Sequence, residues 1–318
     1  MKFLKYIYRP GGEDYMAVKI GFIGTGNMGG AILKGLSVQH DKYEIFAYEL
    51  NTKLADDLSR SYAVKFLNSI GGLIDTCQVV IAAVKPSQMD VVMKDCANHF
   101  DSKKLFITIA AGLPIKYYES FLGSDKKIVR TMPNTPALVG EGMTVVSYGK
   151  NVERSEIELV ISIFSSMGRV EELPESMMSD VIALTSSSPA YVFMMIEAMA
   201  DAAVKFGIPR NTSYRLAAQT VMGSAKMVLE TGRHPAELKD MVCSPAGTTI
   251  EAVAALENKG FRNAIIHAMD ECTKRAKEIG SEPRHVKVID TRANLLIRGE
   301  TYIQTVKANI DTIVDALK

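Results

Sequence analysis

The pattern of apolar and polar positions divides the chain into two unlike halves. Short apolar runs alternate with helical periods up to residue 172, and they predict buried strands at 17–23, 44–48, 79–84 and 105–109. Short strands at 145–148 and 168–170 are predicted to flank a helix at 152–167. Pro133 and Pro136 predict an irregular loop after a short strand within 128–136. The first half is therefore predicted to be an α/β domain with a doubly wound, mostly parallel sheet.

Long helical periods without strands characterise the second half. One predicted helix begins at the N-cap Ser188, has Pro189 at its first position and stops at Gly207. The next helix ends at Gly232, and a last long helix covers 261–279. The first two are apolar around most of their circumference, so they must be buried on every side. In a domain of roughly a hundred residues the simplest burial is against a second subunit, which predicts an obligate homodimer.

These patterns divide the chain into four segments. We expect an N-terminal extension (1–16), a dinucleotide-binding domain (17–172), an all-α substrate and dimerisation domain (173–280) and a C-terminal, helical extension (281–318). Charges interrupt the apolar run of residues 1–15, which argues against a signal peptide. No apolar window is long enough for a membrane helix, so no membrane partner is expected.

Composition narrows the function classes. The chain is 47% hydrophobic and 23% charged, with a net charge of +1, which argues against a nucleic-acid partner held by phosphate neutralisation. The cysteines lie far apart without a CxxC pair, and the histidines lack the spacing of metal ligands. We therefore expect a cytoplasmic protein without a metal site.

A glycine-rich stretch, Gly24-Thr25-Gly26-Asn27-Met28-Gly29, lies between the first predicted strand and a helix. In that context the glycines allow a tight turn and bring the backbone close to a pyrophosphate at the helix N-terminus. This stretch predicts a Rossmann-type domain that binds NADH or NADPH. Glu49 ends the next strand roughly 25 residues after Gly24, where an acidic side chain binds ribose hydroxyls and repels a 2′-phosphate. It favours NADH over NADPH, although nearby Lys53 offsets part of its charge.

Further cofactor contacts are expected where other strands end, because ligands bind at the carboxyl edge of an open parallel sheet. Lys85 is interpreted as contacting cofactor or solvent at a helix start rather than as a catalytic group. The predicted cofactor-binding residues are Gly24, Thr25, Gly26, Asn27, Met28, Glu49, Asn68, Ala83, Val84, Lys85, Pro86, Ala110, Gly112 and Asn134.

A second candidate site lies in the last third of the chain. Pro245 and Gly247 favour a turn, and an amphipathic helix follows it. The unpaired N–H groups of a helix start suit an anion, so Gly247, Thr248 and Thr249 are predicted to seat a carboxylate. The alternative interpretation is that Thr248 merely caps a buried helix.

Ser244-Pro245-Ala246-Gly247-Thr248-Thr249-Ile250, followed by Gly260-Phe261-Arg262, resembles the signature of the pyrroline-5-carboxylate reductase family. The glycine-rich stretch, Ala110-Ala111-Gly112 and Pro189-Ala190-Tyr191 agree with that family in the same order. The resemblance implies hydride transfer from the nicotinamide to the imine carbon of Δ1-pyrroline-5-carboxylate, which gives L-proline. It also implies interlocked subunits, with each active site shared between two chains.

The resemblance implies roles for individual residues as well. Gly247 and Thr248 would seat the substrate carboxylate, and catalytic Thr249 would hydrogen-bond the ring nitrogen as it is protonated. Glu175 matches a family glutamate near the substrate, with a cap for the following helix as the alternative. Two departures are Ala246 and Ser188, which stand where the family commonly has glycine.

Two other functions stay open at this point. One is a different dehydrogenase on the same plan, of the β-hydroxyacid or prephenate type, which would need a general-base Lys or His in the helical half. His234 and Lys226 lack the expected setting near a glycine-rich helix start. The other is a non-catalytic paralogue that binds a dinucleotide, against which the intact Thr248 and Thr249 argue.

Overall fold

The computed structural model describes residues 17–281. The predicted extensions at 1–16 and 281–318 lie outside this range, except for Ser281, the last residue of a helix. Within it, eight strands form one sheet in the order β3-β2-β1-β4-β5-β6-β7-β8. All neighbouring strands are parallel except β6 and β7, so the predicted mostly parallel sheet is confirmed. The strands are β1 (Val18–Ile23), β2 (Tyr43–Tyr48), β3 (Val64–Phe66), β4 (Val79–Ala82), β5 (Leu105–Thr108), β6 (Lys127–Pro133), β7 (Gly142–Tyr148) and β8 (Gly168–Glu172).

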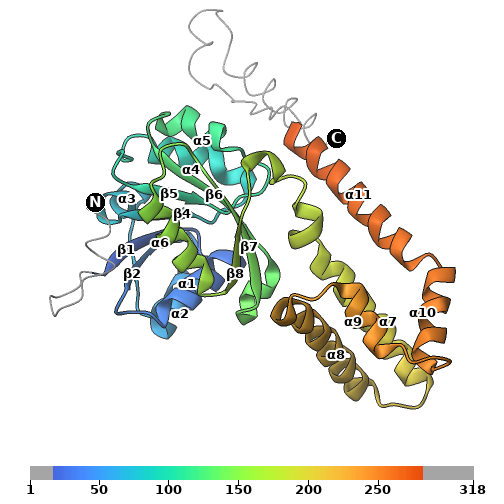
Figure 1. The fold of residues 1–318 in the computed structure, drawn as a ribbon. Coiled ribbons are helices and arrows are strands. Elements are labelled where there is room, and N and C mark those ends of the chain that lie inside the picture. The colour runs from blue at the N-terminus through green and yellow to red at the C-terminus, as the bar shows by residue number, and fades with distance from the viewer. Residues whose placement is uncertain (1–16, 282–318) are drawn as a thin grey trace, which may run out of the picture. The chain divides into compact units, whose positions relative to one another are not determined.

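Helices cover both faces of this sheet (Figure 1). Apolar side chains of α1 and α6 pack on one face, and those of α3, α4 and α5 pack on the other. Both layers form because the central strands are apolar on both sides, as strands of a parallel sheet must be. The helices of this half are α1 (Asn27–Ser37), α2 (Thr52–Ser61), α3 (Ile70–Thr76), α4 (Met89–Cys96), α5 (Ile115–Leu122) and α6 (Arg154–Ser165), with the short turns η2 (Pro86–Gln88) and η3 (Thr135–Val139).

The short strand predicted within 128–136 is present, but the predicted loop starts too early, because β6 continues to Pro133, which pairs with Thr144. This strand pairs with β5 only as far as Arg130 and pairs with β7 up to Pro133. Pro133 therefore lies at the end of a ladder and beyond the β5 edge, where a missing N–H costs little. The irregular part begins after it, at η3.

The second half is helical, as predicted. Its elements are η4 (Glu175–Met177), the π-helical turn η5 (Ile182–Ser186), α7 (Ser188–Lys205), α8 (Arg210–Thr231), α9 (Pro235–Val242), α10 (Thr248–Asn258) and α11 (Phe261–Ser281). The N-cap of α7 is Ser187 rather than the predicted Ser188, whose hydroxyl donates to the Ala183 carbonyl. The π-helical turn η5 directly precedes this N-cap. Gly232 ends α8 in the left-handed conformation, as expected of a helix terminator.

The segment that leads into the helical half packs on the carboxyl end of β6 and on β7. Met178 is fully buried in a cluster with Met132 and Val145. The Asn134 amide nitrogen donates to the Thr185 carbonyl at 3.0 Å. The helical half therefore starts from a point that is fixed to the sheet by both apolar and polar contacts.

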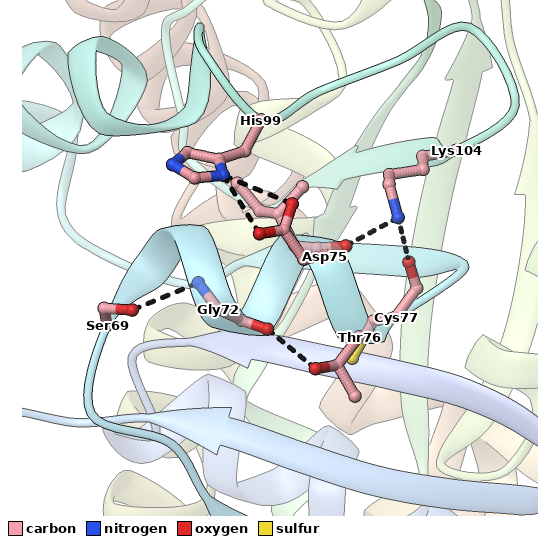
Figure 2. A network of polar contacts seen from close by, with 8 residues as sticks. Ser69, Gly72, Asp75, Thr76, Cys77, His99 and Lys104 are labelled. Atoms are coloured by element: carbon pink, nitrogen blue, oxygen red, sulfur yellow. Dashed lines mark hydrogen bonds and ion pairs between the residues drawn. The ribbon is translucent and has the colours of Figure 1, made fainter.

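Helix α3 packs against β1, the strand that leads into the glycine-rich stretch. A Cβ added at Gly21 of β1 would lie 2.9 Å from both Cys77 Sγ and Leu73 Cγ, so the helix and the strand are in direct contact. Polar contacts hold both ends of this short helix (Figure 2). Ser69 accepts the Gly72 N–H at its N-terminus, and Lys104 Nζ donates to the carbonyls of Ile74 (2.6 Å) and Cys77 (3.0 Å) at its C-terminus.

Replacement of Lys104 by methionine tests this C-terminal contact. Lys104→Met keeps the aliphatic stem but removes the charged donor, which leaves two partly buried carbonyls without it. We expect a loss of about 1–2 kcal/mol in the free energy of unfolding, measured by urea denaturation. Lys103→Met, at the exposed neighbouring lysine, should change it by less than about 0.5 kcal/mol. Equal effects of the two changes would contradict the assignment.

Candidate functional site

Three glycines shape the turn from β1 into α1, each for a different reason. Gly24 adopts a φ of +87°, which a side chain rarely tolerates. At Gly29 a Cβ would lie 2.6 Å from the Gly24 oxygen and 2.9 Å from Ala83 Cβ, so only glycine lets α1 approach the sheet this closely. At Gly26, the N-cap of α1, a Cβ would meet no atom within 4 Å. Protein packing therefore does not require glycine at 26, whereas close approach of a pyrophosphate to the backbone would.

The first turn of α1 faces that open position. Its first intrahelical bond runs from Gly30 N to Gly26 O at 2.7 Å. The N–H groups of Asn27 and Met28 precede this bond and have no partner inside the helix. Together with the positive end of the helix dipole they suit a pyrophosphate, as the sequence predicted.

Glu49 ties the glycine-rich turn to the end of β2. One carboxylate oxygen accepts the Thr25 N–H (2.8 Å) and the Thr25 hydroxyl (2.9 Å), and the other accepts the Asn51 N–H (2.9 Å). Burial alone would raise the pKa of Glu49, but the hydrogen bonds from Asn51 and Thr25 outweigh it and lower the pKa. Glu49 is therefore negatively charged at neutral pH, at the position from which it would repel a 2′-phosphate.

The ends of β1, β4 and β5 lie side by side. Ile23 is in register with Ala82, and Ala82 with Thr108, so the turns that follow emerge together at one edge of the sheet. This edge carries the predicted cofactor residues Ala83, Val84, Lys85, Pro86, Ala110 and Gly112. Lys85 is exposed at the start of η2, and Asn68 is exposed in the bend after β3. Their contacts to a cofactor stay predictions.

Asn134 is already engaged inside the chain. Its amide oxygen accepts the Met143 N–H at 2.9 Å, while its nitrogen donates to the Thr185 carbonyl. The side chain thus joins β6, β7 and the π-helical turn. This structural role accounts for an asparagine here, and cofactor binding by Asn134 stays a prediction.

Glu175 makes a contact that neither interpretation of the sequence foresaw. Its Oε1 accepts the Ile115 N–H at 2.6 Å and lies 3.3 Å from Arg130 Nη1. Glu175 therefore caps the start of α5, so its interpretation as a cap for the following helix is wrong. Arg130, which was not predicted as a site residue, is almost fully buried on β6. Its signal in the sequence is one charge inside the apolar run Ile128-Val129-Arg130.

The turn before α10 differs in detail from the predicted anion seat. Gly247 is the N-cap and no side chain caps the helix, so the interpretation of Thr248 as the cap is wrong. The Gly247 N–H already donates to the Ser244 carbonyl at 3.1 Å. The amides free for an anion in this first turn are therefore those of Thr248, Thr249 and Ile250, one position later than predicted. The Thr248 side chain is exposed and that of Thr249 is half-buried.

Ala246 carries backbone strain in this turn. Its φ is +55°, and no other non-glycine residue in 17–281 has a positive φ. The resemblance implied a glycine at this position, and the left-handed conformation, which glycine adopts most readily, gives the physical reason. Gly247 itself is constrained, because a Cβ there would lie 2.2 Å from Ser244 Oγ.

No group of three or more potential metal ligands occurs between residues 17 and 281. Over the same range, none of the helices is long and apolar enough to cross a membrane.

Comparisons with known proteins cover both halves of the chain. A family model described as pyrroline-5-carboxylate reductase dimerisation matches residues 175–279, and one described as NADP oxidoreductase coenzyme F420-dependent matches residues 19–112. The chain is 47% identical over 266 residues to the pyrroline-5-carboxylate reductase of Escherichia coli (strain K12), covering 83% of this chain and 99% of that one. It is 42% identical over 274 residues to the Methanosarcina acetivorans reductase, covering 83% and 98%.

Two solved structures are similar over the same part of the chain. The pyrroline-5-carboxylate reductase of Coxiella burnetii matches with a TM-score of 0.78 at 32% identity, covering 83% of this chain and 99% of that one. The Plasmodium falciparum pyrroline carboxylate reductase with NADP bound matches with a TM-score of 0.73 at 34% identity, covering 83% and 98%.

Replacement of Glu49 by glutamine tests its role in cofactor choice. Glu49→Gln removes the charge but keeps an acceptor for Thr25, so we expect the ratio of kcat/KM for NADPH to that for NADH to rise about tenfold. Glu44→Gln, the same change on β2 before its carboxyl end, should leave this ratio unchanged. An unmoved ratio in the Glu49 variant would show that its charge does not select the cofactor.

Because Ala246 is strained, we expect that replacing it with glycine stabilises the protein, whereas most glycine substitutions destabilise. A left-handed conformation costs alanine about 1–2 kcal/mol, of which about 0.4–1 is offset by the greater freedom of unfolded glycine. Ala246→Gly should therefore raise the free energy of unfolding by about 0.5–1 kcal/mol, measured in urea at a fixed protein concentration. Ala255→Gly in the C-terminal half of α10 should lower it by about 1 kcal/mol. A loss of stability in both variants would exclude strain at Ala246.

Proposed function

Because the chain belongs to the pyrroline-5-carboxylate reductase family, we propose that it reduces Δ1-pyrroline-5-carboxylate to L-proline with NADPH or NADH. The observation that carries the proposal is that two helices of one chain start without a side-chain cap, which leaves first-turn amides for anions. A glycine-rich helix start at the carboxyl edge of the sheet suits a dinucleotide, and the start of α10 suits a small carboxylate. Family membership argues against the alternative that the chain is a dehydrogenase of the β-hydroxyacid or prephenate type.

The residues at the sheet edge fit a nicotinamide dinucleotide. The open space at Gly26 admits a pyrophosphate, and the Asn27 and Met28 amides of the first turn would bind it. Glu49 would accept hydrogen bonds from the ribose next to the adenine. When bound, the reduced cofactor supplies a hydride to the imine carbon.

The start of α10 would bind the substrate at two points. The first-turn amides of Thr248 and Ile250, together with the dipole of the helix, would hold the carboxylate. The Thr249 hydroxyl would hydrogen-bond the ring nitrogen, which gains a proton as the carbon gains the hydride. Two fixed points orient a five-membered ring, so orientation contributes a large part of the rate. Substrate contact by Glu175 would need to coexist with its bonds to Ile115 and Arg130.

We propose that the active enzyme is a homodimer built through residues 173–280. Self-association agrees with the dimerisation model that matches this part of the chain. In α7 and α8 most apolar side chains are open to solvent in a single chain; Phe193 is 62% exposed and Met222 is 55% exposed. Burial of such side chains against a second copy would stabilise both. The division into a cofactor domain (17–172) and a helical domain (173–280) belongs to the same proposal.

A cytoplasmic location is also part of the proposal. Within the part of the chain that the structure covers, all four cysteines are free thiols. Burial raises the pKa of Cys77 and that of Cys96 to about 12, so both stay protonated and unreactive at neutral pH. This usage of cysteine suits a reducing compartment.

Turnover of pyrroline-5-carboxylate by the purified full chain, followed by oxidation of NADPH or NADH, tests the proposed function directly. In that assay, Thr249→Val should lower kcat about a hundredfold, because it removes the only hydroxyl proposed at the ring nitrogen. Thr249→Ser keeps the hydroxyl and should retain most of the rate. Cofactor affinity should be the same in all three proteins, and an undiminished kcat in the valine variant would remove Thr249 from the mechanism.

A further inference from the structure

A buried pair of hydroxyl groups lies directly beneath the Ala110-Ala111-Gly112 turn. Thr108 and Tyr118 are both fully buried, and their oxygens are 2.7 Å apart. Thr108 is the last residue of β5, whereas Tyr118 belongs to α5, the helix that follows the turn. The pair therefore connects β5 and α5, the strand and the helix on either side of the turn.

The same Thr108 side chain holds the first residue of the turn. Its Oγ1 accepts the Ala110 N–H at 3.2 Å, in a buried position. The last ladder bond before the turn runs from Ile109 N to Ala82 O, so the Ala110 N–H is the first one that the sheet does not pair. The backbone then reverses at Gly112, where φ is +77°. Thr108 thus determines the direction in which the chain leaves the sheet.

Neighbouring side chains pack tightly around this pair. Thr131 of β6 donates its hydroxyl to the Thr108 carbonyl at 3.0 Å, again within the core. The Tyr118 ring packs against Phe106 and Tyr117, with ring centroids 5.4 Å and 5.0 Å away. A buried hydrogen bond between groups fixed in this way is strong, because neither partner can exchange it for water.

The turn lies where the nicotinamide half of a dinucleotide is expected. In the order β2-β1-β4-β5, Glu49 follows β2 on one side of the glycine-rich stretch, and the Ala110 turn follows β5 on the other. A dinucleotide lies across this edge with its pyrophosphate over β1 and α1. If Glu49 faces the adenosine ribose, the opposite half extends over the ends of β4 and β5.

We propose that Thr108, supported by Tyr118, is a positioning residue that aligns the Ala110-Ala111-Gly112 turn with the nicotinamide half of the cofactor. This inference rests on the proposed function, since it requires a nicotinamide dinucleotide at this edge. It assigns Thr108 no contact with the cofactor. Loss of its hydroxyl acts through the turn, which would no longer have an acceptor for the Ala110 N–H.

The test compares the whole cofactor with a fragment that lacks nicotinamide. Titration calorimetry gives the dissociation constants of two pairs of ligands: NADPH with 2′-phospho-ADP-ribose, and NADH with ADP-ribose. Calorimetry is chosen because the chain has no tryptophan whose fluorescence could report binding. Thr108→Val keeps the shape of the side chain and removes the hydroxyl. It should weaken the whole cofactor about tenfold and the fragment by less than about twofold. Thr108→Ser should restore binding of the whole cofactor.

Two further variants keep the result interpretable. Thr144→Val makes the same change at an equally buried threonine of β7 and should alter neither constant. Tyr118→Phe should weaken the whole cofactor selectively but less than Thr108→Val does, and it provides the test if the valine variant does not fold.

Equal weakening of cofactor and fragment would overturn the proposal, since it would indicate a general structural effect. Unchanged binding of the whole cofactor in the Thr108 and Tyr118 variants would overturn it too. If the unaltered protein binds cofactor but does not reduce pyrroline-5-carboxylate, only the proposed reaction fails. If it binds no cofactor at all, both the inference and the proposed function fail.

Discussion

Helix α1 lies so close to the ends of β1 and β4 that no side chain fits between them at Gly29. This contact places the first turn of α1, whose amides have no partner inside the helix, at the carboxyl edge of the sheet. The glycine-rich turn, the link from Glu49 to Thr25 and the alignment of the neighbouring strand ends all depend on this approach.

The start of the helical half is held to the sheet by contacts of its connecting segment. Arg130 brings a charge into the core of β6, where an unpaired charge is costly, and Glu175 supplies the opposite charge from the connecting segment. The same carboxylate caps α5, so one side chain links a strand, a helix and the entry to the helical half. Met178 and Asn134 add an apolar and an amide contact nearby. The position from which α7 starts is thereby determined by the sheet.

The sequence predicted the features that follow from local patterns. Parallel strands buried on both faces are continuous apolar runs, and the spacing of Gly24, Gly26 and Gly29 reflects the geometry of a single turn. It did not predict contacts between distant segments. Nothing near Glu175 in the sequence indicates that its partner is the Ile115 amide, 60 positions earlier. Pro133 was misjudged because its tolerance depends on where the neighbouring ladder ends, which is a property of the assembled sheet.

At the turn before α10, too, the sequence predicted the element but not its hydrogen bonds. Its residue types indicated a helix start, but the assignment of amides depended on whether Gly247 donates to Ser244, and the backbone conformation at Ala246 decides this. An alanine held in the left-handed region turns the chain so that the free amides begin at Thr248. In a single chain this turn is largely exposed, and water would compete for every hydrogen bond that it offers to a substrate. Exclusion of that water would strengthen the hydrogen bonds to a carboxylate bound there. It would also favour a hydride transfer next to it. The apolar surface of α7 and α8 requires a cover for the same reason, so a second copy of the chain would satisfy both needs at once.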